Sequence, residues 1–260
     1  MKLSTKEIAL ISVFAALHVI ISRIPGIPVI GIESGKIELT VVLVPVTGMI
    51  LGPWIGGLAA FLGNFVAWLI PSTTFYGMLN LPTGPIGAIV AGALARNDKK
   101  SNWKVAALIL LVLNALWYIS PPGIEVPYYP FLHLGALALI LTFKGKISDL
   151  LRSEDKQKVT WGTTIASFSG IMANHMTGNL IFIASIGWFI QLRGIKDALV
   201  NLGFSWLKSG LPKGDPTGLG ALFALMLPIS VIERFLMTAI AVPISVGVLY
   251  ALKKGGIISI

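Results

Sequence analysis

The stretch VVLVPVTGMILGPWIGGLAAFLGN, residues 41–64, decides the fold, because it is apolar throughout and carries no charge. Glycines recur along it, and Pro45 and the pair Gly52-Pro53 interrupt it. Proline stops a helix from running straight through, and glycine lets two backbones approach closely in lipid, where small residues are the usual packing device. The pattern predicts two membrane helices joined by a very tight turn at Gly52-Pro53.

The composition of the whole chain indicates an integral membrane protein. Of its 260 residues, 55% are hydrophobic and only 12% are charged, whereas about a quarter of the residues in a soluble domain are charged. The absence of cysteine excludes disulfides, zinc–thiolate sites, iron–sulfur clusters and cysteine nucleophiles. The net charge of +9 suggests nucleic-acid binding at first sight. In a membrane protein, lysine and arginine held on the cytoplasmic face explain that charge better.

Eight apolar segments follow one another along the chain. They predict an all-α, polytopic membrane helix bundle of six to eight spans, which forms a single integral membrane domain over residues 1–260. A full span needs about 20 apolar residues, so the short second and fourth segments are expected to be tilted, broken or only partly inserted. The eight segments are 7–22, 37–51, 53–70, 82–95, 104–119, 127–143, 162–190 and 219–252.

The distribution of lysine and arginine predicts the orientation in the membrane. With the N-terminus inside, most of the 20 basic residues fall in the inner connections, and fewer fall in the outer ones. This asymmetry favours N-in and C-in with an even number of spans. The outer loops 23–37, 71–81 and 120–130 are rich in proline, glycine and aromatic residues. They suit either a rigid lid over an outward-facing pocket or an aromatic belt at the interface. The long connection 191–218 can carry a helix along the membrane surface.

Polar side chains within apolar segments are candidate functional positions, because such groups are costly in lipid. The richest group is SGIMANHMTGN in the seventh segment, where His175 and Asn179 share one helical face and Asn174 lies about 100° to the side. Two amides and one imidazole suit a small polar heterocyclic ligand, and they also suit hydrogen bonding between helices. Asn64, in the third segment, has the same two interpretations.

Glu233 and Arg234 are ionisable neighbours in the eighth segment. Adjacent helical residues point about 100° apart, so we expect these two to pair poorly with each other and each to find another partner or water. For Arg234 the alternatives are an ion pair with another span and a contact with a substrate carboxylate. Tyr128 and Tyr129 can stack on a ligand ring or anchor the chain at the interface.

Neither a cofactor, a metal site nor a catalytic site is expected from the motifs. The three histidines, His18, His133 and His175, lie on three different segments without an H-x-x-x-H pattern. The chain has no G-x-S-x-G, paired-histidine metalloprotease helix, Walker A motif, GxGxxG or C-x-x-C. ATP hydrolysis, if it is used, must therefore come from a partner.

The opening stretch resembles a region of the substrate-binding membrane subunits called S components, from energy-coupling-factor (ECF) transporters. In that family an apolar helix ends in a G-P turn and is followed by a glycine-rich helix start. The opening helix ALISVFAALHVIIS and the segment LPTGPIGAIVAGALAR are also similar, so the resemblance covers residues 6–96. It implies a subunit that captures a vitamin, a vitamin precursor or a metal ion from outside and docks to a membrane scaffold driven by two ATPase subunits. Ser12 and Ala16, on the first helix, would contact the scaffold.

We therefore expect a multi-pass protein of the cell membrane that takes up a small organic nutrient and is not an enzyme. The alternatives are a proton-coupled secondary transporter, with His175 or Glu233 carrying the proton, and a membrane enzyme or assembly factor without a transport role. Nucleic acid is not an expected partner. The candidate substrate-binding residues are Asn64, Tyr128, Tyr129, Asn174, His175, Asn179 and Arg234.

Overall fold

The computed structural model of this chain is a helix bundle, which confirms the predicted all-α class. In the part of the chain that the structure describes, the strands are β1 (Ile27–Pro28) and β2 (Lys36–Ile37), which pair antiparallel. The described residues are 3–28, 36–37, 39–70, 74–96, 102–201, 214–215 and 217–256.

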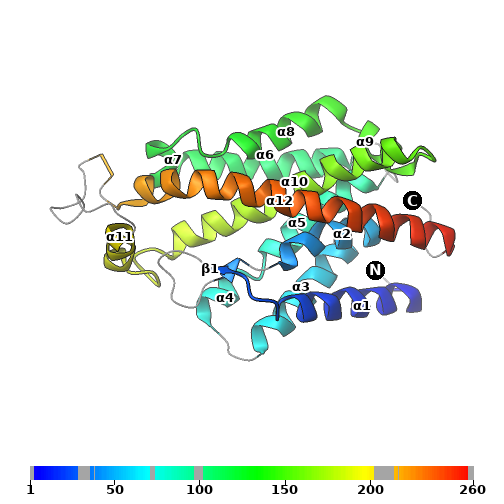
Figure 1. The fold of residues 1–260 in the computed structure, drawn as a ribbon, viewed down its shortest axis with the longest axis horizontal. Helices are drawn as coiled ribbons and strands as arrows, with labels where there is room; N and C mark the ends of the chain where they lie inside the picture. The colour runs from blue at the N-terminus through cyan, green and yellow to red at the C-terminus, as the bar shows by residue number, and fades with distance from the viewer. Residues whose placement is uncertain are drawn as a thin grey trace.

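Each predicted apolar segment contains one longer helix, and short helices occupy several connections (Figure 1). The longer helices are α1 (Thr5–Ile21), α2 (Thr40–Leu51), α3 (Pro53–Leu69), α5 (Thr83–Ala95), α6 (Trp103–Tyr118), α8 (Phe131–Phe143), α10 (Lys156–Ser185) and α12 (Leu219–Lys254). The short helices are α4 (Phe75–Leu79), α7 (Pro121–Glu125), α9 (Lys146–Arg152) and α11 (Leu192–Asn201).

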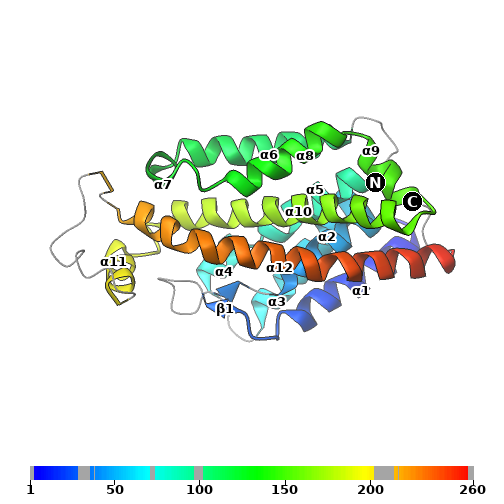
Figure 2. The same ribbon diagram turned by 45° about the horizontal axis from the view of Figure 1, so that its top comes forward.

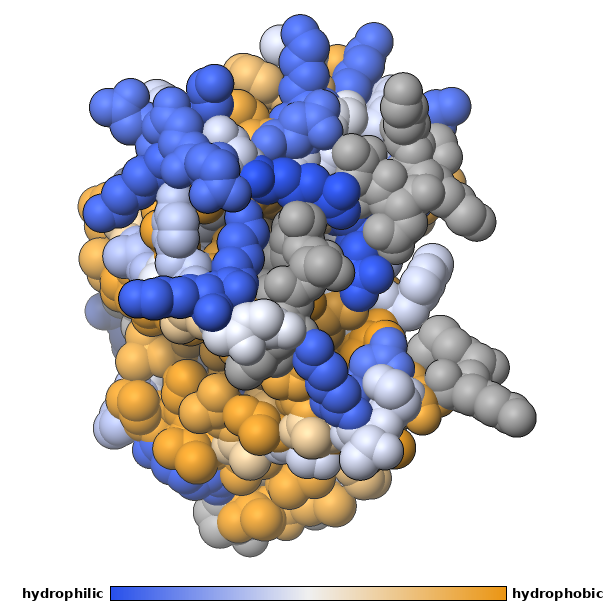
Figure 3. Space-filling view, turned by 90° about the vertical axis from the view of Figure 1, so that its right-hand side faces the viewer, coloured by the Kyte–Doolittle hydropathy of each residue, from blue (hydrophilic) through white to orange (hydrophobic). Residues whose placement is uncertain are grey.

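Both ends of the chain lie at the same end of the bundle, because successive longer helices alternate in direction (Figures 1 and 2). The short helix α9 lies at this end as well, whereas α7 and α11 lie at the opposite end (Figure 1). Figure 3 faces the end that carries the termini and shows hydrophilic side chains gathered over a large part of it. Lysines stand at the start of α1 and α6 and at the end of α12, at Lys6, Lys104, Lys253 and Lys254.

Two stretches of the described chain are long and apolar enough to cross a membrane by length and composition alone. They are Phe75–Ala95, which comprises α4 and α5, and α12. α12 continues through Pro228 and Pro243 without ending at either. The helices α2, α3, α6 and α8 are apolar but shorter.

Helix α2 is the central helix of the bundle. All 12 of its residues are buried, and a helix of that length rises only about 18 Å, less than the roughly 30 Å of a bilayer core. Neighbouring helices therefore cover α2 on every side. The predicted tight turn after it is confirmed, since Gly52 has φ +81° and Pro53 begins α3 directly.

Glycines let α2 touch its neighbours backbone to backbone. A Cβ atom placed on Gly48 would lie 2.1 Å from the carbonyl oxygen of Ala88 in α5, and one on Gly56 of α3 would lie 2.8 Å from the Cα of Gly48. These approaches exclude any side chain larger than hydrogen. The glycine-rich pattern of residues 41–64 therefore sets the spacing of α2, α3 and α5.

Polar contacts connect the C-terminal end of helix α1 to the rest of the bundle. Arg23 donates from Nη1 to the carbonyl oxygen of Ile70 at 2.6 Å and from Nη2 to that of Ala67 at 2.9 Å. These carbonyls belong to the end of α3, where a helix leaves acceptors without internal partners. His18 is fully buried, and its Nε2 lies 3.3 Å from Thr47 Oγ1 of α2.

Part of the predicted outer surface lies outside the described residues. The loops 23–37 and 71–81 are described only in part, because residues 29–35 and 71–73 are outside these ranges, as are residues 202–213 of the long connection. The described part of that connection contains α11, which buries Ile195 and Leu199 and exposes Arg193 and Asp197.

Candidate functional site

An aromatic platform lies where α6 and α8 meet α12. The rings of Trp117 and Tyr129 stack at 4.6 Å between centroids and 19° between planes. Phe223 of α12 meets both rings edge-on, at 4.9 Å from Trp117 and 5.0 Å from Tyr129. Trp117 and Tyr129 are 0% and 3% exposed. The geometry is that of favourable aromatic pairs, and it forms a flat apolar wall inside the bundle.

The turn between α6 and α8 brings Trp117 and Tyr129 together. Ser120 caps α7 by accepting a hydrogen bond from the Gly123 backbone N–H at 3.2 Å, and prolines fill the first helical positions after it. A Cβ on Gly123 would collide with the Trp117 carbonyl oxygen. The sequence SPPG therefore folds the chain back tightly enough for the two rings to stack.

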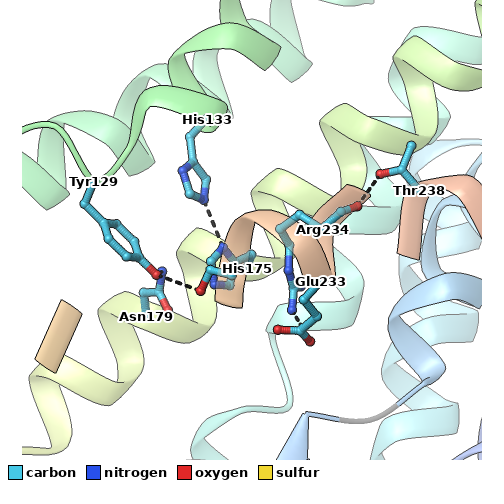
Figure 4. Close-up of polar contacts among 8 residues, drawn as sticks. Tyr129, His133, His175, Asn179, Glu233, Arg234 and Thr238 are labelled. Carbon is cyan, nitrogen blue, oxygen red and sulfur yellow. Dashed lines mark hydrogen bonds and ion pairs between the residues drawn. The ribbon is translucent and has the colours of Figure 1, made fainter. Parts of the chain in front are cut away.

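Polar groups from α8, α10 and α12 lie near Tyr129 of the platform (Figure 4). The imidazoles of His133 and His175 face each other, with Nε2 of the first 3.2 Å from Nδ1 of the second. Asn179 donates from Nδ2 to the Tyr129 hydroxyl at 3.3 Å, and that hydroxyl lies 3.4 Å from Ser230 Oγ. Three helices thus meet through one hydrogen-bonded cluster, in which a single proton must lie between the two imidazoles.

The Glu233–Arg234 pair completes the cluster on α12. The two residues are 5% and 1% exposed, and Arg234 Nη2 lies 2.5 Å from Glu233 Oε1. The expectation that these neighbours pair poorly is therefore wrong. Both side chains are long enough to bend together, and an unpaired ion in this buried position would cost several kcal/mol. Among the described residues, neither forms a salt bridge with another helix.

Arg234 also interacts electrostatically with residues at the platform. It lies within electrostatic range of Tyr129, His133 and His175. Its Nε, like the indole Nε1 of Trp117, is buried and has no hydrogen-bond partner among the described residues. A buried N–H donor without an acceptor costs about 1–3 kcal/mol. The cluster therefore combines packed aromatic rings with buried N–H donors that have no acceptor among the described residues.

We call the set Trp117, Tyr129, His133, His175, Asn179, Phe223, Ser230, Glu233 and Arg234 the interhelical cluster. It contains four of the predicted site residues, namely Tyr129, His175, Asn179 and Arg234.

Three other predicted residues lie elsewhere. Tyr128 is 56% exposed. Asn174 faces α5, where its Cβ would lie 3.0 Å from a Cβ placed on Gly87. Asn64 also faces α5, with its Nδ2 2.6 Å from a Cβ placed on Gly84.

The predicted docking residues lie on the surface of the bundle. Ser12 and Ala16 are both exposed on α1, and Ser12 Oγ donates to the Ile8 carbonyl oxygen at 3.0 Å. Their spacing of four residues places them on one face of the helix.

Several members of the cluster were not singled out from the sequence as site residues, namely Trp117, His133, Phe223 and Ser230. A signal for two of them exists. Tyr129 and His133 are four residues apart, as are His175 and Asn179, and Ser230 and Arg234. Four-residue spacing puts each pair on one helical face, and the structure turns these faces toward each other.

Comparisons with known proteins confirm the resemblance seen in the sequence. Residues 2–124 match the model of the family described as ECF-type riboflavin transporter, S component. That description names a transporter subunit, in agreement with the expectation that this chain is not an enzyme.

A protein of Methanocaldococcus jannaschii that is described as uncharacterized is 38% identical over 152 residues, which are 58% of this chain and 50% of that protein. The chain thus spans about half the length of this curated relative. No solved structure matches the chain.

Proposed function

We propose that this protein is the substrate-binding subunit of an ECF-type transporter and that it captures a small, flat organic nutrient in the interhelical cluster. The observation that carries the proposal is the family match over residues 2–124 together with a buried ring platform beside unpartnered N–H donors. A heterocyclic vitamin or precursor has the matching features, which are a stacking face and ring acceptors. We also propose that the ligand, as it enters from outside, contacts Tyr128, Asn64 and Asn174.

In this proposal the chain is a single multi-pass domain of the cell membrane with both termini in the cytoplasm. Support comes from the hydrophilic end of the bundle, which carries the termini and the lysines of α1, α6 and α12 (Figure 3). An excess of lysine and arginine marks the cytoplasmic side. The end of the bundle with α7 and α11 then faces outside. The platform lies nearer to this outer end, because Trp117 is in the last turn of α6 and Tyr129 comes just before α8. The ligand would therefore enter from outside.

Thermal protection tests this proposal directly. The purified protein in detergent is heated with each water-soluble vitamin over a range of concentrations, and the excess is taken to reach about 100 times the dissociation constant of any vitamin that binds. Riboflavin is the first probe because it appears in the name of the matched family. At that excess a ligand adds about 2.7 kcal/mol, so we expect the apparent Tm to rise by roughly 5–10 °C. The proposal fails if no vitamin or precursor in the panel raises the Tm.

The exposed face of α1 would dock to a membrane scaffold subunit. We expect the double substitution Ser12→Trp and Ala16→Trp to abolish co-purification with a co-expressed scaffold, because indoles on this face keep two helices apart. Ligand binding should not change, because both side chains are exposed and α1 contributes no residue to the interhelical cluster. The control is Leu108→Trp on α6, which is 60% exposed on another helix. Normal co-purification of the double variant would refute this docking face.

A proton-coupled secondary transporter is the second candidate, and one contact favours it. The His133–His175 hydrogen bond and the buried Glu233 carboxylate lie in one cluster, as in a proton relay. Such a transporter would accumulate substrate in liposomes in response to a pH gradient without any ATPase. Glu233→Gln would then remove the dependence on the gradient.

A further inference from the structure

Charged side chains are scarce in the interior of this bundle. Among the described residues, the buried ones are Asp215, Glu233 and Arg234. Asp215 caps the start of α12, where its Oδ2 accepts from the Ala221 backbone N–H at 2.9 Å. Glu233 and Arg234 are thus the two buried ions beside the aromatic platform, and they bring it one negative and one positive charge.

The two ions do not have equivalent positions. Arg234 shares a helical face with Ser230, whose hydroxyl contacts Tyr129, and its Nε remains without a partner. Glu233 lies one residue away, about 100° around the helix, and reaches back to Arg234 Nη2. Arg234 therefore brings a buried N–H donor without a partner to the turn of α12 that follows Ser230, while its Nη2 pairs with Glu233.

We infer that Glu233 determines the charge of the ligand: by neutralising Arg234 it makes the cluster select a neutral ligand with acceptor atoms and reject anionic analogues of the same ring. This inference rests on the proposed function, since it assumes that a flat ligand binds at the platform. Glu233 is a specificity-determining residue in it and does not itself contact the ligand.

The physical reason is the charge balance in a poorly screened site. A neutral ligand gives Arg234 Nε an acceptor and leaves the sum of charges at zero. An anionic ligand would leave a net negative charge next to Glu233 with little water to screen it, which is unfavourable. Without Glu233 the situation reverses, because an uncompensated guanidinium attracts carboxylate or phosphate strongly. Rejection through an opposing charge is a common source of specificity.

The test compares two probes that share one ring, riboflavin and riboflavin 5′-phosphate. Their dissociation constants are measured by quenching of flavin fluorescence on the purified full-length protein. For the unaltered protein we expect riboflavin to bind at least about tenfold more tightly than its phosphate. Glu233→Gln should reduce this preference by about tenfold or invert it, whereas Glu233→Asp, which keeps the charge, should preserve it.

A second variant tests the same inference by removing the positive charge in place of the negative one. Arg234→Gln leaves Glu233 as the net charge, so it should increase the preference for riboflavin over its phosphate. The ratio of dissociation constants in Arg234→Gln tests the inference even if Glu233→Gln does not fold. An unchanged ratio of dissociation constants in the folded variants would overturn the inference while leaving the proposed function standing. If neither probe binds the unaltered protein, the choice of a flavin-like ligand fails as well.

Discussion

Trp117→Leu is expected to weaken ligand binding by about 30-fold. The indole supplies the flat wall on which Tyr129 stacks, and losing one face of a stacked arrangement costs a ligand about 2 kcal/mol. The measurement is the dissociation constant of the best vitamin from the thermal panel, taken on material that elutes as a single species. Trp117→Phe keeps a ring in place and should recover a large part of the affinity.

A matched control separates stacking from a general effect of losing tryptophan. Trp161 lies on α10 but is 65% exposed, so Trp161→Leu should leave the dissociation constant unchanged. Equal affinities for Trp117→Leu and the unaltered protein would place the ligand away from the platform, and the interhelical cluster would then be a purely structural contact between helices.

Gly48→Ala is expected to destabilise the bundle by about 2–3 kcal/mol, which lowers the apparent Tm by roughly 5–10 °C. The added methyl group would meet the Ala88 carbonyl oxygen at 2.1 Å, and a backbone atom cannot move aside as a flexible side chain can. Helices α2 and α5 would have to separate. The readout is thermal unfolding in detergent, followed by loss of the monodisperse species.

Gly247→Ala is the control for that substitution. A Cβ at Gly247, on α12, has no atom within 4 Å, so the change should leave the Tm unchanged or raise it slightly, because alanine favours a helix by about 0.5–1 kcal/mol over glycine. If Gly48→Ala is as stable as Gly247→Ala, the close approach of α2 and α5 does not contribute to the fold as described.

The sequence was sufficient to predict the local features of this fold. Long apolar runs give helices wherever the chain must satisfy its own backbone hydrogen bonds, and Gly52-Pro53 allows only a tight turn because Gly52 takes a positive φ. The alternation of basic and aromatic connections also predicts that both termini lie together, as they do (Figure 1). These properties depend on residues that are close in sequence.

The candidate site could be predicted only in part. Helical spacing identified His175 and Asn179, because the face of a helix follows from its own residues. It did not reveal that His133 meets His175 or that Trp117 stacks on Tyr129, since periodicity does not determine which helices become neighbours. The Glu233–Arg234 pair was misjudged for the same reason. Cβ directions favour separate partners, but in the described part of the chain the two buried ions pair with each other.

The most direct test of the central claim is nutrient uptake by the reconstituted protein. Proteoliposomes contain this chain alone, or this chain with an ECF scaffold and its ATPase pair, and uptake of the vitamin that protects the purified protein is followed over time. The account predicts binding by the chain alone but accumulation only with the complete assembly and ATP. ATP-independent accumulation by the chain alone, driven by a pH gradient, would contradict it.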